Sequence, residues 1–557
     1  MKKNFILLFL IIIIASFLRL LALGDVPSSP DWDETALGYN AFSIMQTGRD
    51  EYGKLLPLVT RSFDDYKPAL YVYFVIPFIK LFGLNILATR MPSAIFGILT
   101  VLATYFLVKE LLGNKGSKIA LISSFLLAIS PWHIQFSRIA FESNVGVAFN
   151  VLAILFFLKG LKKHFYLFFS VFFAGANLYV YQSEKVFTPL LFISLILIFR
   201  KQIFCLPKKY FVSSILLGFL LILPLLGTMV LDKEVLSRAK GVSIFADQTP
   251  FLKENVLRMQ EDKSKEDFLG IILDNRRFLF AKTIVSGYIS HFDFNWLFIE
   301  GDIPRHHAPF MGLLYIWELP FLLIGIYKLI FGEFSKTTKF VIFSWFLLVP
   351  IPASITSGVP HAVRTLNFLP TFQILTAIGV ITFLIKISNI KYQLRLNRGK
   401  ISNMQIKYSI YIFSFLFLIF NFLYYINQYF VQYNYFNSQD WQYGYKEAVS
   451  EVEKIESKYS KIVVSNKPHL DQSYMFFLFY LKYSPEIYQK EVKYASGGFR
   501  ENHSFGKYEF RPIEWNKENR SPKILYVGLP TDFPKKEDVI KTIYFLNNQP
   551  AIKIVKG

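Results

Sequence analysis

The chain has 557 residues, of which 53% are hydrophobic, and it includes 60 Phe and 32 Tyr. So much apolar surface exceeds what one soluble core can bury, and the composition therefore predicts a membrane protein with several spans. The formal net charge of +21 fits basic loops on the cytoplasmic face, so nucleic acid is not an expected partner. The single cysteine, Cys205, excludes an intrachain disulfide and a cysteine-based zinc motif.

Apolar runs long enough to cross a bilayer recur from Phe5 to Leu423. The first run follows two lysines and resembles a secretory signal, but the many later runs favour an uncleaved first helix. We expect an α-helical polytopic membrane fold with about eleven transmembrane helices. The expected spans cover residues 4–23, 90–111, 118–134, 143–159, 165–181, 186–199, 210–231, 311–330, 339–354, 365–386 and 408–428.

Charges in the loops orient these spans. With the N-terminus inside, the cytoplasmic loops hold 21 Lys and Arg residues against only Glu110 and Glu333, as the positive-inside rule requires. We therefore expect a multi-pass protein of the cell membrane whose N-terminus is cytoplasmic. The outer face would then hold residues 24–89, 135–142, 182–185, 232–310 and 355–364, together with an extracytoplasmic C-terminal domain.

Residues 67–83, "KPALYVYFVIPFIKLFG", are apolar but short, and they contain Pro77 and Lys80. Counting this segment as a full span would reverse the orientation of every later loop. We expect an interfacial helix that lies along the outer membrane surface. The alternative is a twelfth span.

The composition changes after residue 430 to short mixed stretches with regular charges. The segment "YKEAVSEVEKIESKYSKIVVSN" has an amphipathic helical pattern and ends in a β-branched run, and "PKILYVGLP" gives a second strand-like run. We expect a transmembrane domain over residues 1–430 and a small α/β domain over residues 431–557. The small domain shows no catalytic motif, so acceptor binding or packing against the membrane domain is its expected role.

The first outer loop opens with "SSPDWDETALGYN", residues 28–40, which places three acids just after the first span. For Asp31 the favoured interpretation is solvation of the loop. Arginines at predicted helix ends, such as Arg90 and Arg138, have snorkelling to the interface as their simpler interpretation. Other outer turns add groups that bind anions or donate hydrogen bonds, and the set is Arg90, Arg138, Lys185, Arg305, His306, His307, His361 and Arg364.

Carboxylates and cations on one face suit sugar transfer from a lipid phosphate. A carboxylate can take the proton from an acceptor hydroxyl as it attacks the anomeric carbon, and cations can stabilise the departing phosphate. A lipid monophosphate has little need for a bridging metal, so no cofactor is expected to be required. The adjacent His306 and His307 do not converge easily on one ion, and a surface loop is the favoured interpretation, with a divalent metal left open.

At "WDE", "DYKPALYVY", "ATRMPSAIFGIL" and "PHAVRTLNFLP" the chain resembles the C-type membrane glycosyltransferases. More narrowly, it resembles the bacterial branch related to the protein O-mannosyltransferases and the lipid A aminoarabinose transferase. The resemblance covers roughly residues 1–430. It implies a polyprenyl-phosphate sugar donor, inversion at the sugar carbon and transfer on the outer side of the membrane to a protein, lipid or glycan acceptor.

The resemblance also implies roles for individual residues. The Asp-Glu motif of the family falls on Asp33 and Glu34, and Asp33 becomes the expected base. Arg90 corresponds to the arginine that begins the second span of the mannosyltransferases, which implies a phosphate contact. Lys67 in "YKPAL" corresponds to the Lys-Pro-Pro or His-Pro-Pro element of the family and gains an expected phosphate role.

Two departures leave the donor open. In the aminoarabinose enzymes a glutamate precedes the Lys-Pro-Pro lysine, whereas Tyr66 stands here, next to Asp65 and Asp64. Those enzymes also carry an arginine two residues after the Asp-Glu pair, where this chain has Ala36, so Arg138 or Arg364 would supply that phosphate contact. The expected substrate-binding residues are Lys67, Arg90, Arg138, Arg364, Asp65 and His361.

Two other kinds of function compete with this interpretation. A lipid-linked glycan polymerase or an oligosaccharyltransferase uses the same setting, although the C-terminal part lacks a "WWD"-type element. A transporter is less favoured because ionisable residues within spans are its usual signature. Here the predicted span interiors are almost free of charge, with Glu318 as the clear exception and Arg19 close to the outer end of the first span.

Overall fold

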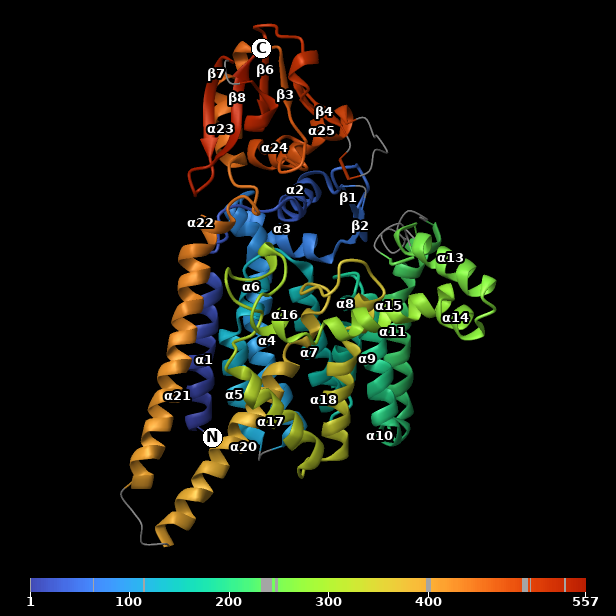
Figure 1. Ribbon diagram of the computed structural model, residues 1–557, viewed down its shortest axis with the longest axis vertical. Coiled ribbons are helices and arrows are strands. Elements are labelled where there is room, and N and C mark those ends of the chain that lie inside the picture. The colour runs from blue at the N-terminus through green and yellow to red at the C-terminus, as the bar shows by residue number, and fades with distance from the viewer. Residues whose placement is uncertain are drawn as a thin grey trace.

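Helices make up most of the chain, and many of them run side by side along the long axis of the molecule (Figure 1). The computed structural model describes residues 2–63, 65–113, 116–231, 243–245, 249–396, 402–492, 499–500, 502–534 and 537–557. Several features named from the sequence lie outside the described residues, namely Asp64, the cytoplasmic bases Lys115, Arg398 and Lys400, and residues 232–242 and 246–248 of the long outer loop.

Each of the eleven expected spans overlaps a helix or a bent helix pair, although α17 begins at Glu318 rather than at residue 311 and α18 ends at Leu348 rather than at residue 354. These helices are α1 Lys2–Leu20, α4 Ile86–Leu112, α5 Ser117–Ile129 with α6 Pro131–Ser137, α7 Glu142–Gly160, α8 Tyr166–Asn177, α9 Glu184–Ile198, α11 Lys208–Leu231, α17 Glu318–Phe331, α18 Lys336–Leu348, α20 Thr371–Leu396 and α21 Ser402–Asn427.

Within the described part of the chain, six helices are long and apolar enough to cross a membrane, and a seventh is added if α5 and α6 form one broken span. The predicted multi-pass character is therefore confirmed, whereas the count of eleven stays a prediction. The axis bends by 59° between α5 and α6. Pro131 stands at this break, where its ring cannot continue the helix of the preceding turn.

The first outer loop forms α2 Trp32–Thr47, a hairpin of β1 Val59–Ser62 and β2 Asp65–Pro68, and α3 Leu70–Phe82. These elements lie at the end of the bundle that faces the C-terminal sheet (Figure 1). With 13 residues, α3 is shorter than the about 20 residues that a spanning helix needs, and so is α8, with 12 residues, which lies at an expected span. The length of α3 therefore does not separate an interfacial helix from a twelfth span, and the interfacial helix stays a prediction.

Further helices lie in the connections between the helices of the expected spans. They are α10 Arg200–Phe204, α13 Thr249–Ser264, α14 Phe268–Leu273, α15 Arg276–Ser290, α16 Phe294–Phe298, η3 Pro304–His306, α19 Ile351–Ser354, η4 Leu366–Phe368, η5 Gln428–Gln432 and α22 Tyr433–Asn437. The helix η5 is a π-helical segment that continues α21 towards the C-terminal sheet.

The C-terminal part of the chain forms a six-stranded sheet with the strand order β4-β5-β3-β6-β8-β7. The central strand β3 is parallel to β5 and β6, and the outer pairs are antiparallel. The predicted α/β character of this part is confirmed. The strands are β3 Lys461–Val464, β4 His503–Phe505, β5 Tyr508–Phe510, β6 Ile524–Gly528, β7 Val539–Tyr544 and β8 Pro550–Lys556, and the helices are α23 Tyr445–Ile455, η6 Glu456–Lys458, α24 Ser473–Leu481, α25 Pro485–Glu491, η7 Trp515–Lys517 and η8 Pro530–Asp532.

The helix α24 joins the sheet to the membrane part because it packs directly against α2. At the contact, a Cβ atom on Gly38 would come within 2.6 Å of the Phe479 ring, so only glycine allows this approach. Nearby, the Gln489 amide donates to the Ser43 hydroxyl at 3.0 Å and to the Thr47 hydroxyl at 3.1 Å. The C-terminal sheet therefore rests on the same helix that begins at the acidic motif.

The orientation predicted from loop charges can be tested with cysteines at opposite ends of the molecule. Cys205 is exposed and follows α10, at the end of the bundle away from the C-terminal sheet, where the N-terminus also lies (Figure 1). Ser504 is exposed on strand β4 of that sheet. On intact cells, a membrane-impermeant maleimide should label Ser504→Cys in a Cys205→Ser background and should label wild-type Cys205 only after permeabilisation. The reverse pattern would reject the orientation.

Candidate functional site

The acidic motif lies in the first turn of α2, which is closed by a capping box. Asp31 is the N-cap, its carboxylate accepts from the Glu34 backbone N–H at 2.9 Å, and the Glu34 carboxylate accepts from the Asp31 N–H at 3.4 Å. Such reciprocal bonds satisfy backbone donors that a helix start leaves unpaired. Because successive helix residues point about 100° apart, Asp33 and Glu34 face different surroundings.

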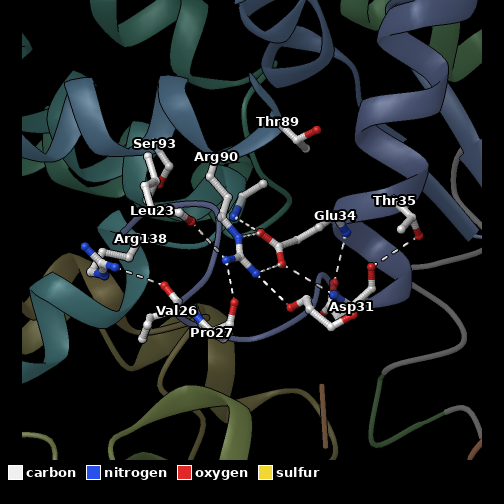
Figure 2. A network of polar contacts seen from close by, with 12 residues as sticks. Leu23, Val26, Pro27, Asp31, Glu34, Thr35, Thr89, Arg90, Ser93 and Arg138 are labelled. Carbon is white, nitrogen blue, oxygen red and sulfur yellow. Dashed lines mark hydrogen bonds and ion pairs between the residues drawn. The ribbon is translucent and has the colours of Figure 1, made fainter. Parts of the chain in front are cut away.

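Glu34 faces the protein interior and is almost completely buried. Its two carboxylate oxygens accept from Arg90 Nε at 2.8 Å and from Arg90 Nη2 at 2.9 Å, and the Ala140 backbone N–H donates to it at 2.8 Å (Figure 2). This paired geometry is the strong form of a charge-assisted hydrogen bond. Both Glu34 oxygens are thus engaged by groups of the protein.

Arg90 uses its remaining N–H groups to bind the segment between α1 and α2. Nη1 donates to the Leu23 and Pro27 carbonyls at 3.1 and 2.9 Å, and Nη2 donates to the Ser29 carbonyl at 2.8 Å. Together with the two bonds to Glu34, all five N–H groups of the guanidinium have acceptors. The phosphate contact predicted for Arg90 stays a prediction, and it would require one of these bonds to open.

Arg138, which follows α6, binds the same segment from the other side. Its guanidinium donates to the carbonyls of Leu18, Ala22 and Val26 at 2.9, 3.2 and 3.0 Å, and it lies 4.7 Å from the Phe430 ring. Both this arginine and Arg90 are fully buried, so the interpretation that they snorkel to the interface is wrong.

Asp33 faces outward and forms an ion pair with Lys67 of strand β2. The exposed fraction of the Asp33 side chain is 26% and that of Lys67 is 12%, so a substrate can approach this pair. Asp65 lies two residues before Lys67 on the same strand, and its carboxylate accepts from the Tyr66 N–H at 2.9 Å. Alternation along a strand places Asp65 and Lys67 on one face of the hairpin.

Asp31 is fully buried, so the interpretation that it solvates the loop is wrong. Its carboxylate accepts from Arg305 Nη1 at 2.9 Å, and the Arg305 guanidinium lies 4.4 Å from the Trp32 ring. Burial raises the pKa of the Asp31 carboxyl to about 7, against the opposing effect of Arg305. On the C-terminal side, Phe499 contacts Trp32 edge to face at 5.6 Å.

His361 is brought to a second cluster, with Asp302 and His306. The Asp302 carboxylate lies 3.1 Å from His306 Nδ1, the Ala362 N–H donates to it at 2.5 Å, and the two histidine rings are 5.2 Å apart. His307 points elsewhere, with its Nδ1 at 2.7 Å from the Ala308 carbonyl. As expected, the adjacent histidines do not converge.

Arg364 donates within its own loop, from Nη1 to the Thr356 hydroxyl and to the Ser357 carbonyl at 2.6 Å each. The structure therefore gathers Asp33, Glu34, Lys67, Arg90 and Arg138 around the start of α2, while His361 joins the separate histidine cluster.

Three contributors, Arg305, the Ala140 backbone N–H and Asp302, have little or no signal in the sequence. The sequence marks Arg305 only as one of several outer bases, and nothing in it pairs Arg305 with Asp31. The backbone N–H of Ala140 carries no sequence signal. Asp302 and His306 stand four residues apart, a spacing that brings side chains together when a chain turns helically, and this was the one available signal.

The buried pair of Glu34 and Arg90 predicts a stability difference between two similar substitutions. Glu34→Gln should lower the free energy of unfolding by about 3–5 kcal/mol, because it leaves the buried guanidinium without its counter-charge. Asp33→Asn makes the same chemical change one residue away, in a partly exposed pair, and should cost less than about 1 kcal/mol. Thermal unfolding of the two purified variants measures the difference, and equal losses would contradict the assignment.

Comparisons with known proteins bear on the fold of the chain. A profile of the family described as "Dolichyl-phosphate-mannose-protein mannosyltransferase" matches residues 66–227. No curated protein sequence gives a significant match.

Solved structures of other proteins have a similar fold. ArnT from Cupriavidus metallidurans in the apo state matches with a TM-score of 0.54 and 12% identity, over 100% of this chain and 98% of ArnT. The same protein bound to undecaprenyl phosphate matches with a TM-score of 0.54 and 13% identity, over 98% and 97% of the two chains.

The archaeal oligosaccharyltransferase AglB from Archaeoglobus fulgidus, in complex with an inhibitory peptide and a dolichol-phosphate, matches with a TM-score of 0.50 and 13% identity. This match covers 86% of the chain and 63% of AglB, so the chain spans less than two thirds of that relative. The resemblance stated from the sequence motifs is confirmed, and the chain is a multi-pass membrane protein with the fold of the C-type membrane glycosyltransferases.

Proposed function

We propose that this chain is an inverting glycosyltransferase that moves a sugar from a polyprenyl phosphate to an acceptor hydroxyl on the extracytoplasmic face of the membrane. The observation that carries the proposal is the ion pair of Asp33 and Lys67. It places a partly exposed carboxylate and an ammonium together beside a membrane-embedded helix bundle, at the helix start that carries the Asp-Glu motif.

In the proposed reaction, Asp33 accepts the proton of the acceptor hydroxyl as the hydroxyl oxygen attacks the anomeric carbon. The bond from that carbon to the phosphate oxygen breaks on the opposite side, and the configuration inverts. The lipid phosphate leaves with the bonding electrons. Among the two acids of the motif, Asp33 suits this role because its side chain is 26% exposed, whereas Glu34 is only 1% exposed.

Lys67 is the proposed contact for the departing phosphate. Its ammonium already lies against Asp33, so a phosphate next to the attacked carbon would lie within its reach. A positioned cation that meets charge as it develops lowers the barrier more than one that binds only the ground state. Asp65, Arg138, Arg364 and His361 stay predicted substrate contacts, supported by their place on the expected outer face.

Glu34 and Arg90 are proposed as positioning residues. Their paired hydrogen bonds hold the first turn of α2 against α4, and the bond from Ala140 adds the segment after α6. The direction of the Asp33 side chain depends on this turn. Catalytic geometry of this kind tolerates only small displacements of the reacting groups.

The matching structures support a lipid phosphate as the donor group. One structure of ArnT is bound to undecaprenyl phosphate, and AglB is in complex with an inhibitory peptide and a dolichol-phosphate. The acceptor of this chain is proposed only as a hydroxyl of a protein, a lipid or a cell-envelope glycan. The contact of the C-terminal sheet with α2 supports a role of that domain in binding the acceptor.

Transfer activity should depend on Asp33. With purified full-length protein, radiolabelled polyprenyl-phosphate sugars and lipid or peptide acceptors, Asp33→Asn should lower kcat by about 10²- to 10⁴-fold, because a general base contributes that much. Asp25→Asn provides the matched control, since Asp25 is an exposed acid of the same outer region. Wild-type turnover in Asp33→Asn would reject the proposed base.

Donor binding should depend on Lys67. Lys67→Gln should raise KM for the polyprenyl-phosphate donor about 10-fold or more and leave KM for the acceptor nearly unchanged, because a charged hydrogen bond to phosphate is lost. Lys80→Gln, on the exposed face of α3, removes the same charge from the same region and serves as the control. An effect on the acceptor alone would contradict the assignment to phosphate.

A further inference from the structure

The histidine cluster consists of side chains from two outer segments that are far apart in the sequence. Asp302 and His306 come from the end of the region 232–310, and His361 comes from the turn 355–364. One oxygen or nitrogen atom from each of the three side chains lies within 4.8 Å of the other two. Two backbone N–H groups of the turn donate to the other segment: Ala362 N–H donates to Asp302 at 2.5 Å, and His361 N–H donates to His291 Nε2 at 3.2 Å.

We propose that Asp302, His306 and His361 bind a divalent transition metal ion of the zinc type. Two imidazoles and one carboxylate form a ligand set that zinc accepts, with a fourth position left for water or another group. A second observation points to a ligand at this place. The Nδ1 atom of His361 is buried and has no hydrogen-bond partner among the described residues.

Apolar side chains surround the cluster, and the His306 ring is buried. Phe136 and Phe141 pack against the His306 ring at 5.6 and 5.9 Å and shield it from water.

Arg305 connects the cluster to the acidic motif. It lies between the proposed ligands Asp302 and His306 in the sequence. Arg305 pairs with Asp31 and covers Trp32, and its carbonyl accepts from the Gln135 amide at 2.6 Å. A bound ion would fasten this segment to the turn that carries His361 and so hold Arg305 in place. Metal binding itself does not depend on the proposed function, whereas this positioning effect does.

The test measures bound metal rather than activity. Purified full-length protein is treated with EDTA, loaded with Zn²⁺, desalted and analysed by mass spectrometry for zinc per chain. We expect about one ion per chain in the wild type and less than about 0.1 in His361→Gln or Asp302→Asn, because three protein ligands are the minimum that zinc sites of this kind retain. Co²⁺ in place of Zn²⁺ should give visible absorption bands of a low-symmetry site, lost in the same variants.

His307→Gln is the matched control, because it removes the neighbouring histidine, which lies outside the cluster. It should keep one ion per chain. A wild-type protein that retains no stoichiometric zinc would overturn the proposal, and so would an equal loss in His307→Gln and His361→Gln. Asp33→Asn should keep its zinc even when transfer activity is lost, so a failure of the catalytic proposal and a failure of the metal proposal give different results.

Discussion

The buried pair of Arg90 and Glu34 is the interaction on which the rest of the site depends. Burying a guanidinium away from water costs free energy unless each of its N–H groups has an acceptor. Here one carboxylate and three backbone carbonyls supply the acceptors. Those carbonyls belong to the segment that joins α1 to α2. One side chain of a membrane helix therefore determines where the outer loop begins and which way its first helix points.

This constraint places the three acids of the motif in different surroundings. Glu34 is turned inward and held, Asp31 is buried under Arg305, and Asp33 is left facing outward beside Lys67. Three carboxylates within four residues thus have three different partners. The same helix contacts α24 further along, at Gly38, so the C-terminal sheet and the acids are attached to one rigid element.

Much of this arrangement could be predicted from the sequence, because the distribution of apolar and charged residues along the chain reflects where each segment lies. Long apolar runs, loop charges and the change of composition near residue 430 gave the helical bundle and the α/β part. The Asp-Glu motif and Lys67 could be placed together through the resemblance. The saturation of Arg90 could not be predicted, because its acceptors are backbone carbonyls of Leu23, Pro27 and Ser29, and any residue type offers a carbonyl. The meeting of His361 with His306 depends on tertiary packing between distant turns and leaves no local pattern.

The position of Asp33 in the first turn of α2 has a consequence for the order of events in the proposed reaction. As a carboxylate it interacts favourably with both the positive end of the helix and the Lys67 ammonium. Once it takes a proton, both attractions fade, and the ammonium is released at the moment when a phosphate oxygen gains negative charge. In the proposed reaction, Lys67 would thus serve two anions in turn, first the Asp33 carboxylate and then the leaving phosphate. The return of Lys67 to Asp33 after the phosphate departs would favour loss of the proton to water and so restore the starting state.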